Sequence, residues 1–153
     1  MRALSPGVRP DSALRVYPDR QQQGIAVNDK LAVATAVTPV LKRLNATSAD
    51  IQASAVMSRD GHTLASVLGD AVNSVRLGAM CATLLSLGEK ASLELNRGHL
   101  RQILIQGEEG YVLLMRIGEK AVLAVVSQPS ANLGMMLVEA RRTASEIVAL
   151  GVV

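Results

Sequence analysis

The stretch from residue 70 to residue 96, DAVNSVRLGAMCATLLSLGEKASLELN, reads as one long helix with more apolar surface than one neighbour can cover. At about 100° per residue, one broad stripe is apolar or small and is expected to bury against the protein's own sheet. Its members are Leu77, Met80, Cys81, Leu84, Leu87, Gly88, Ala91 and Leu95. The opposite side, ordinarily polar, carries Val72, Val75, Ala79, Ala82 and Ser86. Small side chains let two helices approach to about 8 Å, so this side predicts a symmetric helix pair; the alternative is a helix sandwiched within one domain.

The composition indicates one domain and disfavours a nucleic-acid ligand. With 153 residues, of which 49% are hydrophobic, the chain can bury one compact core. It has no Phe or Trp and two Tyr, so it offers few flat side chains on which bases stack. The net charge is +3, but residues 1–24 hold four arginines against two aspartates, which leaves the remaining chain nearly neutral. We expect no nucleic-acid partner, because the basic footprint that one needs is missing.

The cysteine count and the N-terminal sequence bear on the compartment. A single cysteine allows neither an internal disulfide nor a multi-thiolate metal site within one chain, which fits a reducing, cytoplasmic location. Residues 1–27 contain three prolines and lack the apolar core of a signal peptide, so we expect a flexible N-terminal tail followed by a domain at residues 28–153. The longest uncharged stretch of the long helix has twelve residues, short of the roughly 20 that cross a bilayer. No membrane span is therefore expected.

Helices are also expected at the two ends of the domain. The first begins at Asn28, which would be its N-cap, and Pro39 should kink it unless Thr38 caps a fresh turn there. The last covers residues 131–150 and is amphipathic. Its inward face comprises Leu133, Met136, Leu137, Ala140, Ala144 and Ile147.

The remaining segments read as five strands. Residues 52–58 and 62–67 flank an Asp60-Gly61 turn and predict a hairpin, after which Asp70 lies near the N-terminal dipole of the long helix. Residues 96–98 should end that helix. Three further strands, residues 100–106, 111–117 and 121–127, have short glycine-containing links typical of an antiparallel meander. The last, AVLAVVS, is apolar on both faces and should be central, whereas LRQILIQ has the mixed character of an edge.

This order of elements resembles the Roadblock family, named for a dynein light chain, over about residues 28–151. The most specific piece is Ala131-Asn132-Leu133-Gly134 at the start of the last helix, and the Asp60-Gly61 hairpin is second. The resemblance implies an α/β, three-layer Roadblock/profilin-like sandwich. Its five-stranded antiparallel sheet, in the order 2-1-5-4-3, would have the first and last helices on one face and the long helix on the other. The N-terminal tail and Pro39 depart from the family pattern.

The resemblance also implies dimers in which the long helices pair and the third strands join edge to edge. A homodimer or a heterodimer with a paralogue would satisfy this arrangement. It would explain both the doubly apolar helix and the half-apolar edge strand. The expected interface comprises Val72, Val75, Ala79, Ala82 and Ser86 of the long helix, with Ile103 and Ile105 of the strand.

Roadblock domains serve as platforms for small Ras-like GTPases, some as activators of nucleotide hydrolysis and others as scaffolds. The resemblance therefore implies a dimeric regulator or scaffold of such a GTPase. The chain has no G-x-x-x-x-G-K-[ST] phosphate loop, so we expect no intrinsic nucleotide binding and no cofactor. Several arginines could stabilise a partner's transition state, but the sequence assigns none. The candidate partner-binding residues flank the helix pair and are Arg76, Thr83, Lys90 and Glu94.

An enzyme is not expected from the nucleophiles and bases present. Cys81 could pair with His62 or His99, but it falls on the apolar stripe, where a thiol usually acts as a small core residue. The two histidines follow a turn and a helix end, and neither has a carboxylate or a second histidine at metal-ligand spacing. Two other classes stay open, namely a scaffold unrelated to GTPases and a small-ligand sensor, because a fold does not determine function.

Overall fold

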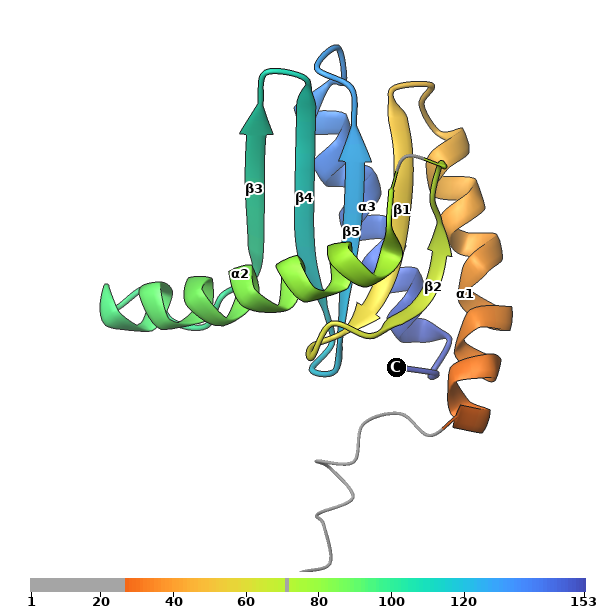
Figure 1. Cartoon of the computed structure of the whole chain (residues 1–153), viewed down its shortest axis with the longest axis horizontal. Helices are drawn as coiled ribbons and strands as arrows, with labels where there is room; N and C mark the ends of the chain where they lie inside the picture. Colours follow the sequence, from red (N-terminus) through yellow and green to blue (C-terminus); the bar gives the residue numbers. More distant parts are fainter. Residues whose placement is uncertain (1–26, 71) are drawn as a thin grey trace, which may run out of the picture.

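The computed structural model describes residues 27–70 and 72–153, and this part of the chain folds into three helices and five strands (Figure 1). In chain order they are α1 (Val27–Ala46), β1 (Ile51–Ser58), β2 (Thr63–Val67), α2 (Ser74–Glu94), β3 (Gln102–Gly107), β4 (Gly110–Ile117), β5 (Ala121–Ser127) and α3 (Leu133–Ala149). The predicted N-terminal tail, residues 1–27, lies outside the described residues apart from Val27. Among the described helices, none is long and apolar enough to cross a membrane.

The strands form one antiparallel sheet in the order β2-β1-β5-β4-β3. Helices α1 and α3 cover one face, and α2 crosses the other face and extends past the edge at β3 (Figure 1). The expected three-layer α/β fold of the Roadblock/profilin type is therefore confirmed. The central position of β5, with six of its seven residues buried, and the edge position of β3 are confirmed as well.

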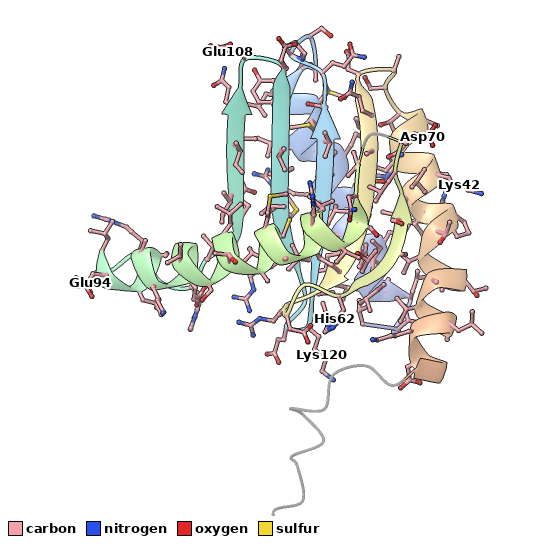
Figure 2. All side chains as sticks on the ribbon, in the orientation of Figure 1. Lys42, His62, Asp70, Glu94, Glu108 and Lys120 are labelled. Atoms are coloured by element: carbon pink, nitrogen blue, oxygen red, sulfur yellow. The ribbon has the colours of Figure 1, made fainter. Side chains whose placement is uncertain are left out.

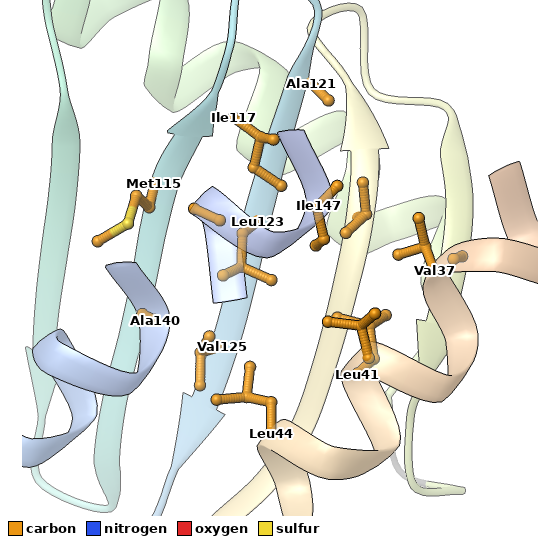
Figure 3. Packing of buried hydrophobic residues seen from close by; sticks show 14 of the residues in the cluster. Val37, Leu41, Leu44, Met115, Ile117, Ala121, Leu123, Val125, Ala140 and Ile147 are labelled. Atoms are coloured by element: carbon orange, nitrogen blue, oxygen red, sulfur yellow. The ribbon is translucent and has the colours of Figure 1, made fainter. Parts of the chain in front are cut away.

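The larger core lies between the sheet and the pair of helices α1 and α3 (Figure 3). Leu41 from α1, Leu123 from β5 and Ile147 from α3 are all fully buried there. The predicted inward face of α3 is confirmed, because all six of its residues belong to this core or pack against it. Burial of aliphatic side chains from α1, the sheet and α3 in one contiguous cluster supplies most of the stabilisation that the fold needs.

Helix α1 runs through Pro39 without interruption, so the alternative in which Thr38 caps a fresh turn is wrong. The Thr38 hydroxyl instead donates a hydrogen bond to the carbonyl of Ala34, one turn back, at 2.6 Å. A proline removes one backbone donor, but burial of Val37 and Leu41 on either side of it holds the helix together. Asn28 lies inside the helix, which begins one residue earlier, so its predicted role as the N-cap is also wrong.

Helix α2 starts later than the sequence suggested. Asn73 is its N-cap, and the Asn73 side chain accepts hydrogen bonds from the backbone N–H groups of Val75 and Arg76 at 3.0 and 3.1 Å. Asp70 lies outside the helix, so the predicted start of the helix at residue 70 is wrong. An Asn side chain satisfies orphan N–H groups directly, and this contact outweighs a charge placed four residues before the first turn.

The predicted end of α2 is confirmed, whereas α3 begins two residues later than predicted. Asn96 takes φ +55° and Gly98 takes φ +80°, the left-handed conformations that end a helix, just beyond Glu94. In α3 the Asn132 side chain accepts from the N–H of Met135 at 3.0 Å. The Ala131-Asn132-Leu133-Gly134 motif thus works locally as an N-terminal cap.

A second and much smaller core joins α2 to the sheet. Its buried members are Ala55, Met57, Cys81, Leu114, Val122 and Ala124. Helix α2 approaches this face most closely at two glycines. A Cβ on Gly78 would lie 1.9 Å from the carbonyl oxygen of Gly61 in the β1–β2 turn, and a Cβ on Gly88 would lie 3.0 Å from side chains of Leu100 and Ile103. Only a glycine at position 78 permits the close approach to the Gly61 carbonyl oxygen.

Candidate self-association and partner-binding surface

The solvent-facing side of α2 carries a continuous apolar stripe. We use the name outer stripe for its exposed residues, which are Met80, Leu84, Leu87, Ala91 and Leu95. The exposed fractions reach 60% at Leu87 and 67% at Leu95. Their spacing of four, three, four and four residues keeps them in line along a helix and resembles the seam of a coiled coil. Exposure of the whole apolar stripe to water would be energetically unfavourable.

The prediction that these five residues pack against the protein's own sheet is wrong, because all five are exposed. Only part of the predicted stripe faces inward, namely Leu77, Cys81 and Gly88. Small residues face the sheet because α2 crosses it at close range, and the larger side chains are turned outward by roughly 100°. Gly78, which faces the hairpin turn, is the signal that sequence reasoning missed.

The residues predicted to pair two helices lie on the other flank of the exposed surface. Val75, Ala79 and Ser86 are exposed, with Val75 at 78%. Ala82 is half-buried, and its Cβ lies 3.2 Å from where a Cβ on Gly61 would stand, so its side chain is turned partly toward the hairpin. Val72 precedes the helix and is half-buried. Whether any of these residues meets a partner stays a prediction.

The edge of the sheet lies beside the second half of α2 (Figure 1). Strand β3 pairs with β4 on one side, and its other side has no strand within the described part of the chain. Ile103 is half-buried and packs toward α2, whereas Leu104 and Ile105 are each more than a third exposed. An edge with exposed aliphatic side chains is a template for pairing with another strand.

The four candidate partner-binding residues form an exposed ridge of α2, although Lys90 also lines a cavity between α2 and the sheet. Arg76, Thr83, Lys90 and Glu94 are all exposed and recur along one line of the helix. The Thr83 hydroxyl donates to the carbonyl of Ala79 at 3.0 Å, a local bond that leaves the ridge itself open. The ridge separates the outer stripe from the flank of Val75 and Ala79.

A polar cluster holds the second half of α2 to the start of β3. Glu89 accepts hydrogen bonds from the N–H of Leu100 at 2.8 Å and lies 2.6 Å from Nδ1 of His99. A guanidinium nitrogen of Arg116 lies 3.9 Å from the same carboxylate. The hydrogen bond with His99, followed by that from Leu100, lowers the pKa of Glu89. This contact could not be predicted from a local sequence pattern, because ten residues separate Glu89 from His99.

Five arginines surround one concavity of about 920 Å³ below the β3 and β4 ends of the sheet. We use the name arginine groove for the surface lined by Arg59, Arg97, Arg101, Arg116 and Arg141, with Glu119 as its one acidic residue. Four separate parts of the described chain contribute these side chains: the β1–β2 turn, the α2–β3 loop, β4 and α3. The near-neutral charge of the whole domain conceals this local concentration of positive charge. Arg76 and Arg142 do not line the groove.

A smaller cavity of about 400 Å³ lies between α2 and the sheet. Its apolar lining includes Leu85, Leu100 and Val122, and Glu89 and Arg116 stand at its margin. A cavity of this size and mixed lining can hold a small organic molecule.

The candidate nucleophile and bases are not assembled into a catalytic site. Cys81 is buried in the small core, and burial raises its pKa to about 11, which keeps the thiol protonated and inert. His62 and His99 are exposed, as expected, but each lies beside one carboxylate: His62 is 3.0 Å from Asp60, and His99 is beside Glu89. Within residues 27–70 and 72–153, no group of three metal-ligating side chains is found.

The fold agrees with comparisons to known proteins. The family described as the Roadblock/LC7 domain matches residues 39–127, more than half of the chain. The protein therefore belongs to the Roadblock/LC7 family. Among curated relatives, the uncharacterised protein MJ0310 of Methanocaldococcus jannaschii is 34% identical over 111 residues, which cover 72% of this chain and 96% of the relative.

Solved structures extend the similarity of fold. MglB of Myxococcus xanthus superposes with a TM-score of 0.71 at 14% identity, over 78% of this chain and 91% of MglB. A Roadblock/LC7 domain from Streptomyces avermitilis gives a TM-score of 0.70 at 17% identity, over 76% of this chain and 98% of that domain. These similarities concern the fold.

Proposed function

We propose that the protein is a dimeric regulator or scaffold of a small Ras-like GTPase and does not itself bind nucleotide. The outer stripe of α2 is the observation that carries this proposal. Met80, Leu84 and Leu87 form an apolar line on a helix whose other side already packs on the sheet. A second α2 laid against this line, with two β3 edges joined beside it, would remove the apolar surface from water.

Membership of the Roadblock family supports the choice of partner, since the resemblance implies a platform for small Ras-like GTPases. The chain lacks a phosphate loop, so nucleotide chemistry would belong to the GTPase. The role would be scaffolding or, in its more active form, acceleration of GTP hydrolysis.

The GTPase would bind the ridge of Arg76, Thr83, Lys90 and Glu94, which stays exposed on α2. In a dimer, two such ridges would run beside the helix pair and offer a rigid surface of mixed charge. A standard interface requires roughly 800 Å² from each partner, and two neighbouring 21-residue helices present a surface of that order.

Binding of the small Ras-like GTPase encoded nearest to this gene tests the proposal. Calorimetry with the GTPase loaded with GDP or with a GTP analogue should show binding in at least one state. Arg76→Ala with Lys90→Ala should weaken it about tenfold or more, because truncation of a residue that carries binding energy, as Arg often does, costs more than about 1 kcal/mol. The matched pair Lys42→Ala with Arg142→Ala, exposed on the α1 and α3 layer, should bind normally. A GTPase that binds in neither state would refute the proposed partner.

The cavity between α2 and the sheet supports a second candidate function, that of a small-ligand sensor. Its apolar lining and adjacent charges suit a small molecule with one polar end. Native mass spectrometry of the purified protein checks this: a retained molecule that is lost on filling the cavity with Ala82→Leu favours the sensor. A mass equal to that of the polypeptide alone contradicts it.

A further inference from the structure

The two ends of the edge strand β3 carry opposite charges. Arg97 and Arg101 precede the strand and line the arginine groove, next to α2. Glu108 and Glu109 follow the strand at the tip of the β3–β4 turn, at the far end of β3 (Figure 2). All four residues are exposed. The strand therefore has a basic start and an acidic end.

None of these four side chains has a counter-charge within the part of the chain that the structure describes. The ion pairs found there involve Glu89, Asp60 and Glu146 as acids. The arginine groove has Glu119 as its single acidic lining residue against five guanidinium groups. A guanidinium forms its strongest contacts with carboxylates, which it can hold through two hydrogen bonds. The groove is thus electrostatically complementary to an acidic segment.

Antiparallel joining of two β3 edges brings the opposite charges together. Directly opposite residues of an antiparallel pair point to the same face, so a two-fold axis normal to the sheet passes through a residue and not between two residues. With the axis at Ile105, position 109 faces position 101, so Glu109 of one copy stands opposite the partner's Arg101. With the axis at Leu104, the acidic tip stands opposite positions 99 and 100, which keeps it beside the loop that carries the partner's Arg97.

We propose that the occupant of the arginine groove is the Glu108-Glu109 tip of a second copy of this chain. Each dimer contains this contact twice, once at either end of the joined strands. This contact rests on the proposed dimer with paired β3 edges. It adds a pattern of opposite charges that fixes the register of the two strands and selects the partner chain. A paralogue without an acidic tip leaves Arg97 and Arg101 without this counter-charge, which disfavours the mixed pair.

A charge swap between two variants of the full-length protein tests the contact. The tip variant is Glu108→Lys with Glu109→Lys, and the groove variant is Arg97→Glu with Arg101→Glu. In either variant alone, like charges face each other at both ends of the strand pair, and the dimer Kd should rise by about tenfold or more. Mixed one to one, the variants restore opposite charges at both ends. Sedimentation velocity should then show mixed dimers with the wild-type Kd.

The matched control carries the same charge reversal as the groove variant but on the α1 and α3 layer: Lys42→Glu with Arg142→Glu. It should dimerise like the wild type and gain nothing from mixing with the tip variant. If wild type and both variants dimerise equally, the contact is wrong while the dimer stands. A dimer weakened equally by the control is a general charge effect and overturns the contact. A monomeric wild type overturns both the contact and the proposed dimer.

Discussion

The two faces of the sheet differ in how completely one chain covers them. Among the residues that the structure describes, nineteen buried residues form the core under α1 and α3, whereas six form the core under α2. Helix α3, with 17 residues, buries five of them, but α2, with 21 residues, buries Gly78 and Cys81 alone. The face of the sheet under α1 and α3 is therefore covered by residues of the same chain. The α2 face rests on the sheet through small residues and presents its large ones to solvent.

This difference separates the part of the molecule that determines folding from the part that we assign to binding. Side chains that make dense contacts on all sides specify one structure, and they lie almost entirely on the α1 and α3 face. Exposed apolar side chains in a line instead mark a place for another molecule. Substitutions on the α1 and α3 face should therefore be followed mainly by stability measurements, and substitutions on the exposed side of α2 mainly by binding measurements.

The largest effect is expected from Leu41→Ala in α1. Leu41 is fully buried, so the cavity left behind should lower the free energy of unfolding by about 2 to 5 kcal/mol. Leu31→Ala on the same helix is the matched control, since Leu31 is 72% exposed and its loss should change stability by less than about 0.5 kcal/mol. Urea denaturation measures both. Equal losses of stability in the two variants would contradict the distinction between buried and exposed positions in this layer.

A smaller effect is expected where α2 touches the β1–β2 turn. Gly78→Ala places a Cβ 1.9 Å from the Gly61 carbonyl oxygen, and the backbone must move apart. The cost should be about 1 to 3 kcal/mol, even though alanine is the better helix former. Gly69→Ala, where a Cβ meets no atom within 4 Å, should be nearly neutral by thermal denaturation. A neutral Gly78→Ala would mean that α2 does not depend on this close contact.

The smallest effect concerns how the stability of the protein at acid pH depends on Glu89 and its hydrogen-bond partner His99. Because folding lowers the pKa of Glu89, its contribution to stability is present above the ordinary value of about 4.3 and is lost as pH falls through the lowered pKa. Glu89→Gln should remove this part of the acid dependence in urea titrations between about pH 2 and pH 6. His99→Ala deletes the main cause of the shift and should reduce the same dependence. Identical acid profiles for all three proteins would contradict this role of Glu89.

The sequence predicted the elements well because their signals are local. Alternation, short glycine links and the run AVLAVVS marked the strands and placed β5 in the centre. The strand order and the layers came from the resemblance to the Roadblock family. The starts of α1 and α2 were misplaced, since Asp70 and Asn73 are both acceptable caps and the bond of Asn73 to Val75 is visible only in three dimensions.

The surface was harder to predict than the fold. Both sides of α2 are apolar, so hydrophobic periodicity could not decide whether Leu77 or Leu87 faces the sheet. Close approach decides it, and the only sequence marks of that approach are Gly78 and Gly88. The arginine groove was invisible for a related reason, because its guanidinium groups come from residues as far apart as Arg59 and Arg141.

The molar mass of the protein in solution tests the central claim, that a second copy completes the α2 face, most directly. Sedimentation velocity at micromolar concentration should give the wild type twice the 16.1 kDa of the chain. Leu84→Glu with Leu87→Glu, which places two charges in the outer stripe, should give 16.1 kDa. Leu31→Glu, exposed on α1, should remain a dimer. A wild type that stays monomeric, or a double variant that still dimerises fully, would contradict the assignment of the outer stripe.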